Sequence, residues 1–142
     1  MFASPSELSP DFAAVCDAQA RIRGVVHRTP LVTCSTLDHM AGRRLFFKCE
    51  HLQRAGAFKF RGASNAVMKL ADAIASRGVA THSSGNHAGA LALAARIRHI
   101  PAHIVMPSNA SPVTVGRFMV LPYGPRKNNF SNCRHCSPIG KF

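Results

Sequence analysis

Apolar residues alternate between helix-like spacing and short continuous runs through the middle of the chain. In residues 58–77 they recur every three or four positions, which predicts an amphipathic helix, and residues 88–99 predict a second helix after a glycine turn. Apolar runs at 44–50, 79–84 and 102–107 predict strands. The resulting order of strand, helix, strand, helix, strand indicates a parallel α/β sheet with right-handed crossovers. The apolar positions of the first helix are Phe60, Ala63, Val67, Leu70 and Ile74.

Residues 9–24 predict a further helix near the start of the chain. Ser9 is a suitable N-cap, Pro10 suits the first helical position, and Gly24 follows the end. The apolar residues expected to line one face of this helix are Phe12, Val15 and Ile22.

Three shorter signals complete the predicted elements. An extended segment is expected after Pro30, and a short helix over 35–42 with Ser35 as its cap. Gly78 is a good stop for the long helix. After Pro112 no period remains, so we predict no regular structure there.

The charge balance is strongly basic and uneven. The formal net charge is +12, which suits an anionic partner such as nucleic acid, an anionic membrane or a phosphate-bearing ligand. All six acidic residues lie at or before Asp72. Because no aromatic-basic motif accompanies the charge, a solvated basic surface is favoured and no nucleic-acid partner is expected.

Cysteine usage and hydropathy predict a reduced, cytoplasmic protein. The five cysteines form no regular framework, no apolar run is long enough to span a membrane, and the first residues lack the layout of a signal peptide. Cys133 and Cys136 form one pair only, whereas structural zinc needs four ligands, so no metal site is expected.

Lys59 stands between two phenylalanines, Phe58 and Phe60, just after a glycine-bearing loop. An apolar setting disfavours the charged amine, and a helix start has the same effect. The neutral amine is the nucleophile in Schiff-base chemistry. The alternative is a surface lysine whose stem covers apolar residues, and this stretch alone does not exclude it.

The sequence SSGNHAG at 83–89 lies where a predicted strand ends and a helix begins. Such a turn offers free backbone N–H groups to an anion, and Gly85 permits close approach. Ligands bind at the carboxyl ends of strands in parallel sheets, so we expect a carboxylate or phosphate pocket here. A helix cap made of small polar residues is the alternative.

Together, these segments resemble a known family. LFFKCEHLQRAGAFKFRGASNAV followed by THSSGNHAGALALAA, with HRTPL upstream, resembles the pyridoxal-phosphate enzymes of fold type II, and among them the serine racemases and serine/threonine dehydratases. The resemblance covers about residues 10–112 and implies a parallel three-layer α/β sandwich of the tryptophan synthase β-like class, here truncated. Residues 1–75 would belong to the large cofactor domain and 76–112 to a partial small α/β domain, leaving 113–142 as an unmatched, disordered or aberrant tail.

The resemblance also implies roles for individual residues in binding pyridoxal 5'-phosphate. Lys59 matches the lysine that holds the cofactor covalently and moves protons on one face of the substrate. Phe58 matches the residue packed beside the cofactor ring, and Asn86 matches the asparagine that hydrogen-bonds the 3'-oxygen of the cofactor.

The substrate side is implied in the same way. Ser84 matches the acid/base on the opposite face in racemases, and Ser83 and His87 match the loop that holds the substrate carboxylate. The implied reaction removes the α-proton of L-serine, L-threonine or a related amino acid. Racemisation and elimination both follow from this step, so the choice between them stays open.

The chain also departs from the family pattern. Nothing in it matches the glycine-rich phosphate loop, the residue facing the pyridine nitrogen or the acidic divalent-metal site of the longer family members. We therefore also consider a non-catalytic fragment and a small basic binding module. A homodimer is expected for the full-length family.

Overall fold

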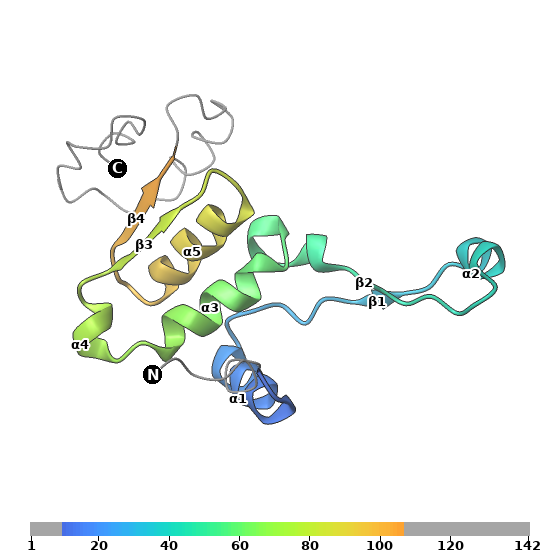
Figure 1. Ribbon diagram of the computed structural model, residues 1–142, viewed down its shortest axis with the longest axis horizontal. Coiled ribbons are helices and arrows are strands. Elements are labelled where there is room, and N and C mark those ends of the chain that lie inside the picture. Colours follow the sequence, from blue (N-terminus) through green and yellow to red (C-terminus); the bar gives the residue numbers. More distant parts are fainter. Residues whose placement is uncertain (1–9, 107–142) are drawn as a thin grey trace, which may run out of the picture.

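The computed structural model describes residues 10–106, drawn in colour in Figure 1. Our expectations for Ser9, for residues 107–142 and for the Cys133–Cys136 pair lie outside this range. The elements are α1 (Phe12–Ile22), β1 (Leu31–Val32), α2 (Ser35–Ala41), β2 (Phe47–Lys48), η1 (Glu50–Leu52), η2 (Arg54–Gly56), α3 (Lys59–Lys69), α4 (Asp72–Ala75), β3 (Val79–His82), α5 (Asn86–Ile97) and β4 (Ala102–Val105).

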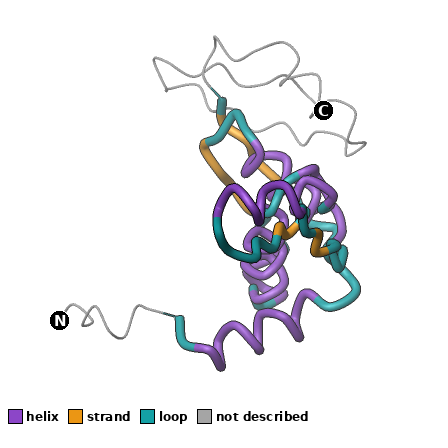
Figure 2. Tube along the Cα trace, turned by 90° about the vertical axis from the view of Figure 1, so that its right-hand side faces the viewer, coloured by secondary structure: helices purple, strands orange, loops and turns teal. Residues whose placement is uncertain are grey.

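Strands β3 and β4 form the predicted parallel pair, connected through α5. The register runs from Val79 opposite Ala102 to His82 opposite Val105. Helix α5 contacts both strands, α3 packs against α5, and α1 packs against α3, so the elements lie in successive layers (Figures 1 and 2). Gly78, which was expected to end the long helix, instead follows the short helix α4, whose C-cap is Ser76, and adopts a φ of +86°.

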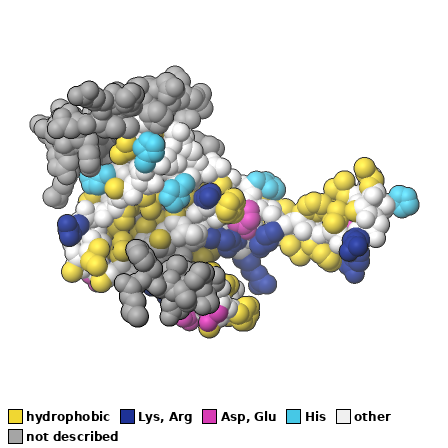
Figure 3. All heavy atoms as spheres, in the orientation of Figure 1, with side chains coloured by type: hydrophobic (Ala, Val, Ile, Leu, Met, Phe, Trp, Pro, Cys, Tyr) yellow, Lys and Arg dark blue, Asp and Glu magenta, His cyan; other side chains and the backbone are white. Residues whose placement is uncertain are grey.

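The strand predicted at 44–50 does not join this parallel pair. Its two-residue core, β2, pairs antiparallel with β1 instead, with Leu31 opposite Lys48 and Val32 opposite Phe47. The two segments are close in sequence, and short connections favour antiparallel pairing. With α2 they form a projecting arm (Figure 1), whose surface carries many apolar side chains (Figure 3). The expectation of one continuous parallel sheet is therefore wrong for its first strand.

The hydrophobic core lies between α3 and α5. Phe60, Ala63 and Val67 on α3 meet small and apolar residues on α5. The predicted helix over 58–77 is divided, because Leu70 adopts an extended ψ of 138° and ends α3. Leu70 is consequently only half-buried and Ile74 is exposed, whereas the first three predicted core residues are confirmed.

Two predicted helix starts need correction. Helix α1 begins at Phe12, later than expected, because the Asp11 carboxylate accepts a hydrogen bond from the Ala14 amide at 2.8 Å and acts as the N-cap. Of its three apolar residues, only Ile22 is buried. In α2 the N-cap position is held by Cys34, and Ser35 is the first helical residue.

Candidate active site

The N-terminal ends of α3 and α5 lie at the same end of the described part of the molecule (Figure 1). Arg98, which ends α5, donates hydrogen bonds to the carbonyl oxygens of Val67 and Leu70 at the end of α3. The two helices pack against each other and have 11 and 12 residues, so their starts are also near each other. In agreement, η2, which lies just before α3, contacts α5. The two segments singled out in the sequence are therefore brought to one region.

Lys59 is the first residue of α3, and its side chain is exposed. Its Nζ atom lies 5.1 Å from the centroid of the Phe58 ring, in a cation–π contact, and Phe58 itself is 59% exposed. Phe60 is fully buried in the core. The apolar pocket expected from both phenylalanines is therefore not formed by the described residues, because neighbouring residues on a helix point in different directions.

The turn over residues 83–87 has the predicted place between β3 and α5. The Ser83 amide donates to Val105 O at 3.1 Å and extends the parallel pairing, while the Ser83 hydroxyl accepts from the Gly85 amide at 3.3 Å. Gly85 is the N-cap of α5, and a Cβ placed there would meet no atom within 4 Å. Asn86 is the first residue of α5.

This turn has unused donors. The side chains of Ser84, Asn86 and His87 are exposed, and within residues 10–106 the backbone amides of Asn86 and His87 donate no hydrogen bond. Such amides at a helix start suit an anion. No hydrogen bond or ion pair among the described residues joins Lys59 to the turn. The structure thus brings the two groups to one end of the core without a direct contact.

A third polar group near Lys59 was missed by sequence reasoning. Arg61 donates from Nε and Nη2 to the two carboxylate oxygens of Glu50, at 2.8 and 2.7 Å. The buried Thr29 donates its hydroxyl to Glu50 Oε1 at 2.6 Å. The hydrogen bonds from Arg61, then that from Thr29, lower the pKa of Glu50 to about 2, against the opposing effect of burial. The pKa of Arg61 is raised, chiefly by its hydrogen bonds to Glu50.

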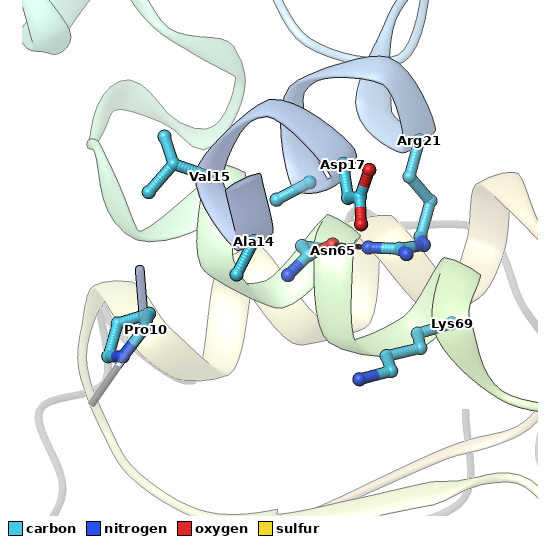
Figure 4. A pocket seen from close by; sticks show the side chains of 8 residues that line it. Pro10, Ala14, Val15, Asp17, Arg21, Asn65 and Lys69 are labelled. Atoms are coloured by element: carbon cyan, nitrogen blue, oxygen red, sulfur yellow. Dashed lines mark hydrogen bonds between the residues drawn. The ribbon is translucent and has the colours of Figure 1, made fainter. Parts of the chain in front are cut away.

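A cavity of about 310 Å³ lies elsewhere, between α1 and α3. In Figure 4, Arg21 from α1 reaches Asn65 on α3, with Nη1 and Oδ1 2.5 Å apart. Neither Lys59 nor the 83–87 turn lines this cavity. Within residues 10–106 no three His, Cys, Asp or Glu side chains are placed to hold a metal ion, and no helix is long and apolar enough to cross a membrane.

Comparisons with known proteins place this arrangement in a family. The profile of the pyridoxal-phosphate dependent enzymes matches residues 22–121. The chain is 57% identical over 100 residues to a serine racemase of Oryza sativa subsp. indica, covering 70% of this chain and 30% of the relative. It is 49% identical over 106 residues to an L-threo-3-hydroxyaspartate ammonia-lyase of Saccharomyces cerevisiae, covering 75% of this chain and 32% of the relative.

A solved structure of maize serine racemase superimposes with a TM-score of 0.74 at 55% identity, covering 77% of this chain and 33% of that one. The predicted fold class, fold type II, is thereby confirmed. The chain spans about a third of the length of these relatives. With the family profile matching well over half of its residues, this chain belongs to the pyridoxal-phosphate-dependent enzymes.

Proposed function

We propose that this chain carries the lysine side of a pyridoxal-phosphate site and belongs to a racemase or ammonia-lyase acting on a small hydroxy amino acid of the L-serine or L-threonine class. The observation that carries the proposal is the shared location of an exposed amine, Lys59 at the start of α3, and a turn at the start of α5 whose first amides have no partner among residues 10–106. The similarity to serine racemases and a hydroxyaspartate ammonia-lyase supports the substrate class.

The described residues fit the groups of the cofactor that they would contact. The Lys59 amine is accessible for covalent attachment, the exposed Phe58 ring beside it offers a flat apolar surface, and the Asn86 side-chain amide is free to donate to the 3'-oxygen. Bound pyridoxal phosphate would supply an electron sink that stabilises negative charge at the α-carbon of the substrate.

The turn before α5 would bind and orient the substrate. The amides of Asn86 and His87, with the Ser83 and His87 side chains, would hold the α-carboxylate at the positive end of the helix. Lys59 would then accept the α-proton on one face, and the Ser84 hydroxyl would hold or return a proton on the other. Return to the opposite face gives the D-amino acid, whereas loss of the β-hydroxyl leads to a keto acid and ammonia.

Cofactor binding and turnover are separate parts of this proposal, because the chain spans about a third of its relatives' length. If the chain binds the cofactor but does not turn over substrate, it is a non-catalytic fragment that carries part of the same site. We propose a cytoplasmic location, where the thiols of Cys16, Cys34 and Cys49 would stay reduced, and a homodimer for the complete enzyme.

Absorbance of the purified 142-residue chain with pyridoxal phosphate tests the proposal. We expect a protein-bound band near the edge of the visible range that is lost in Lys59→Ala. Lys69→Ala, on the same helix but at its other end, is the matched control and should keep the band. No band at saturating cofactor, or an equal band in Lys59→Ala, would contradict the proposal. Assays for D-serine and pyruvate from L-serine then separate the two reaction types.

A further inference from the structure

Three side chains from separate segments meet at the start of α3, and we refer to Thr29, Glu50 and Arg61 as the root cluster. We propose that the root cluster positions Lys59 by fixing the first turn of α3. The inference rests on the proposed role of Lys59, but it can be tested without cofactor.

The three side chains of the root cluster are joined to one another by hydrogen bonds. Arg61 uses two nitrogens on the two oxygens of Glu50, and its Nη2 also reaches Thr29 Oγ1 and His27 O, both at 3.2 Å. Lys48 Nζ donates to Thr29 O at 2.5 Å. A two-point guanidinium–carboxylate pair fixes orientation as well as distance. The guanidinium group of Arg61 is therefore tied to residues of the segments before β1 and after β2.

A second set of hydrogen bonds joins the segments before β1 and after β2. The side chain of Gln53 is buried, and its Oε1 accepts from the His27 amide at 2.9 Å while its Nε2 donates to His27 O at 2.8 Å. The Cys49 amide donates to Pro30 O at 3.0 Å. These hydrogen bonds join the segment before β1 to the segment after β2, and the root cluster joins both segments to α3.

The start of α3 depends on these contacts. Its N-cap residue, Phe58, makes no side-chain capping hydrogen bond and is exposed, and the first turn of a helix has few internal hydrogen bonds of its own. Two neighbours of Lys59 anchor the turn, Phe60 in the core and Arg61 in the root cluster. Phe60 sets the depth of the helix, and Arg61 sets its rotation, so the direction of the Lys59 side chain follows from both.

Hydrogen exchange of the full chain, followed by NMR, tests this inference. The amides of Phe60 and Arg61 bond to Ala57 O and Phe58 O in the first turn. In Glu50→Gln their protection is expected to fall by about tenfold, while amides near the end of α3 keep theirs. Asp72→Asn is the matched control, because it breaks the other ion pair near α3, at the opposite end, and should leave the first turn unchanged.

Two more conservative variants distinguish a local effect on the first turn from a general loss of folding. Thr29→Val removes only the hydroxyl that bridges Glu50 and Arg61 and should loosen the same two amides, whereas Thr29→Ser keeps the hydroxyl and should behave as the unchanged chain. Uniform loss of protection through α3 and α5 in both Glu50→Gln and Thr29→Val would overturn the inference in favour of a purely structural role. Unchanged protection in both variants would also overturn it.

The rate at which pyridoxal phosphate attaches to Lys59 tests whether loosening the first turn of α3 also affects this residue. With pyridoxal phosphate, Glu50→Gln and Thr29→Val are expected to form the Lys59-bound band about tenfold more slowly, while Thr29→Ser and Asp72→Asn match the unchanged chain. Equal rates in all variants would contradict positioning of Lys59. If the unchanged chain forms no band, the proposed function fails, and the exchange data alone still decide whether the root cluster fixes the first turn.

Discussion

Acid should remove the stabilisation that Glu50 gives to the fold. Its pKa is lowered from 4.5 to about 2 by the hydrogen bonds from Arg61 and Thr29. A carboxyl group with a lowered pKa in the folded state stabilises the protein at pH values above its unfolded pKa of 4.5. That contribution is lost as the pH falls from 4.5 through about 2, because the protonated group no longer pairs with Arg61.

The size of the effect follows from the pKa and the exposure of the pair. Lowering the pKa of Glu50 from 4.5 to about 2 corresponds to at most about 3.4 kcal/mol of stabilisation of the folded state. The Glu50 and Arg61 side chains are 19% and 32% exposed, so solvent screens part of this energy. We expect a pH-dependent contribution of about 1–2 kcal/mol to the free energy of unfolding.

Urea unfolding of the unchanged chain and of Glu50→Gln across this pH range measures the contribution. The difference in free energy of unfolding between the two proteins should narrow by about 1–2 kcal/mol between about pH 6 and about pH 2.5. Asp72→Asn is the control, because the Asp72 side chain is fully exposed although it pairs with Arg98. A Glu50→Gln difference that stays constant with pH would refute this account of the pair.

Three further substitutions test the described backbone and core through the same unfolding assay. Gly78→Ala should cost about 2–4 kcal/mol, since its Cβ would lie 2.7 Å from Pro101 O at a φ of +86°. A neutral result would contradict this close approach of Gly78 to Pro101. Ala55→Gly should stabilise by about 0.5–1 kcal/mol by relieving a φ of +62°, and destabilisation would contradict it. Ser64→Ala should stabilise by about 1 kcal/mol, because its buried hydroxyl has no partner among residues 10–106; a loss of stability would reveal a hydrogen bond at Ser64.

The parts of the fold that depend on local signals were predictable from sequence. The turn at Gly85 and the parallel β3–β4 pair combine glycine, small polar residues and a strand–helix–strand order that few other structures satisfy, whereas α5 begins at Asn86, two residues before the predicted start. The break of α3 at Leu70 was not predictable, because the apolar spacing continues across it to Ile74. The division of the chain at residues 75 and 76 into two domains stays a prediction.

The candidate site shows the same contrast. The positions of Lys59 and of the 83–87 turn could be inferred from the residues themselves, but the burial of Phe60 and exposure of Phe58 depend on helix rotation against α5. The root cluster joins Thr29, Glu50 and Arg61, which no periodic pattern connects. The only sequence signal for it was the presence of these residues in two of the segments that resemble the family, Thr29 in HRTPL and the other two in LFFKCEHLQRAGAFKFRGASNAV.

Chemical mapping of the cofactor attachment point tests the central claim most directly. The full chain would be incubated with pyridoxal phosphate, reduced with borohydride, digested and analysed by mass spectrometry. We predict a phosphopyridoxyl group on Lys59 and none at comparable occupancy on Lys48 or Lys69, the other two lysines within residues 10–106. Modification spread evenly over the lysines, or absent from Lys59, would contradict the claim that this chain carries the lysine of a pyridoxal-phosphate site.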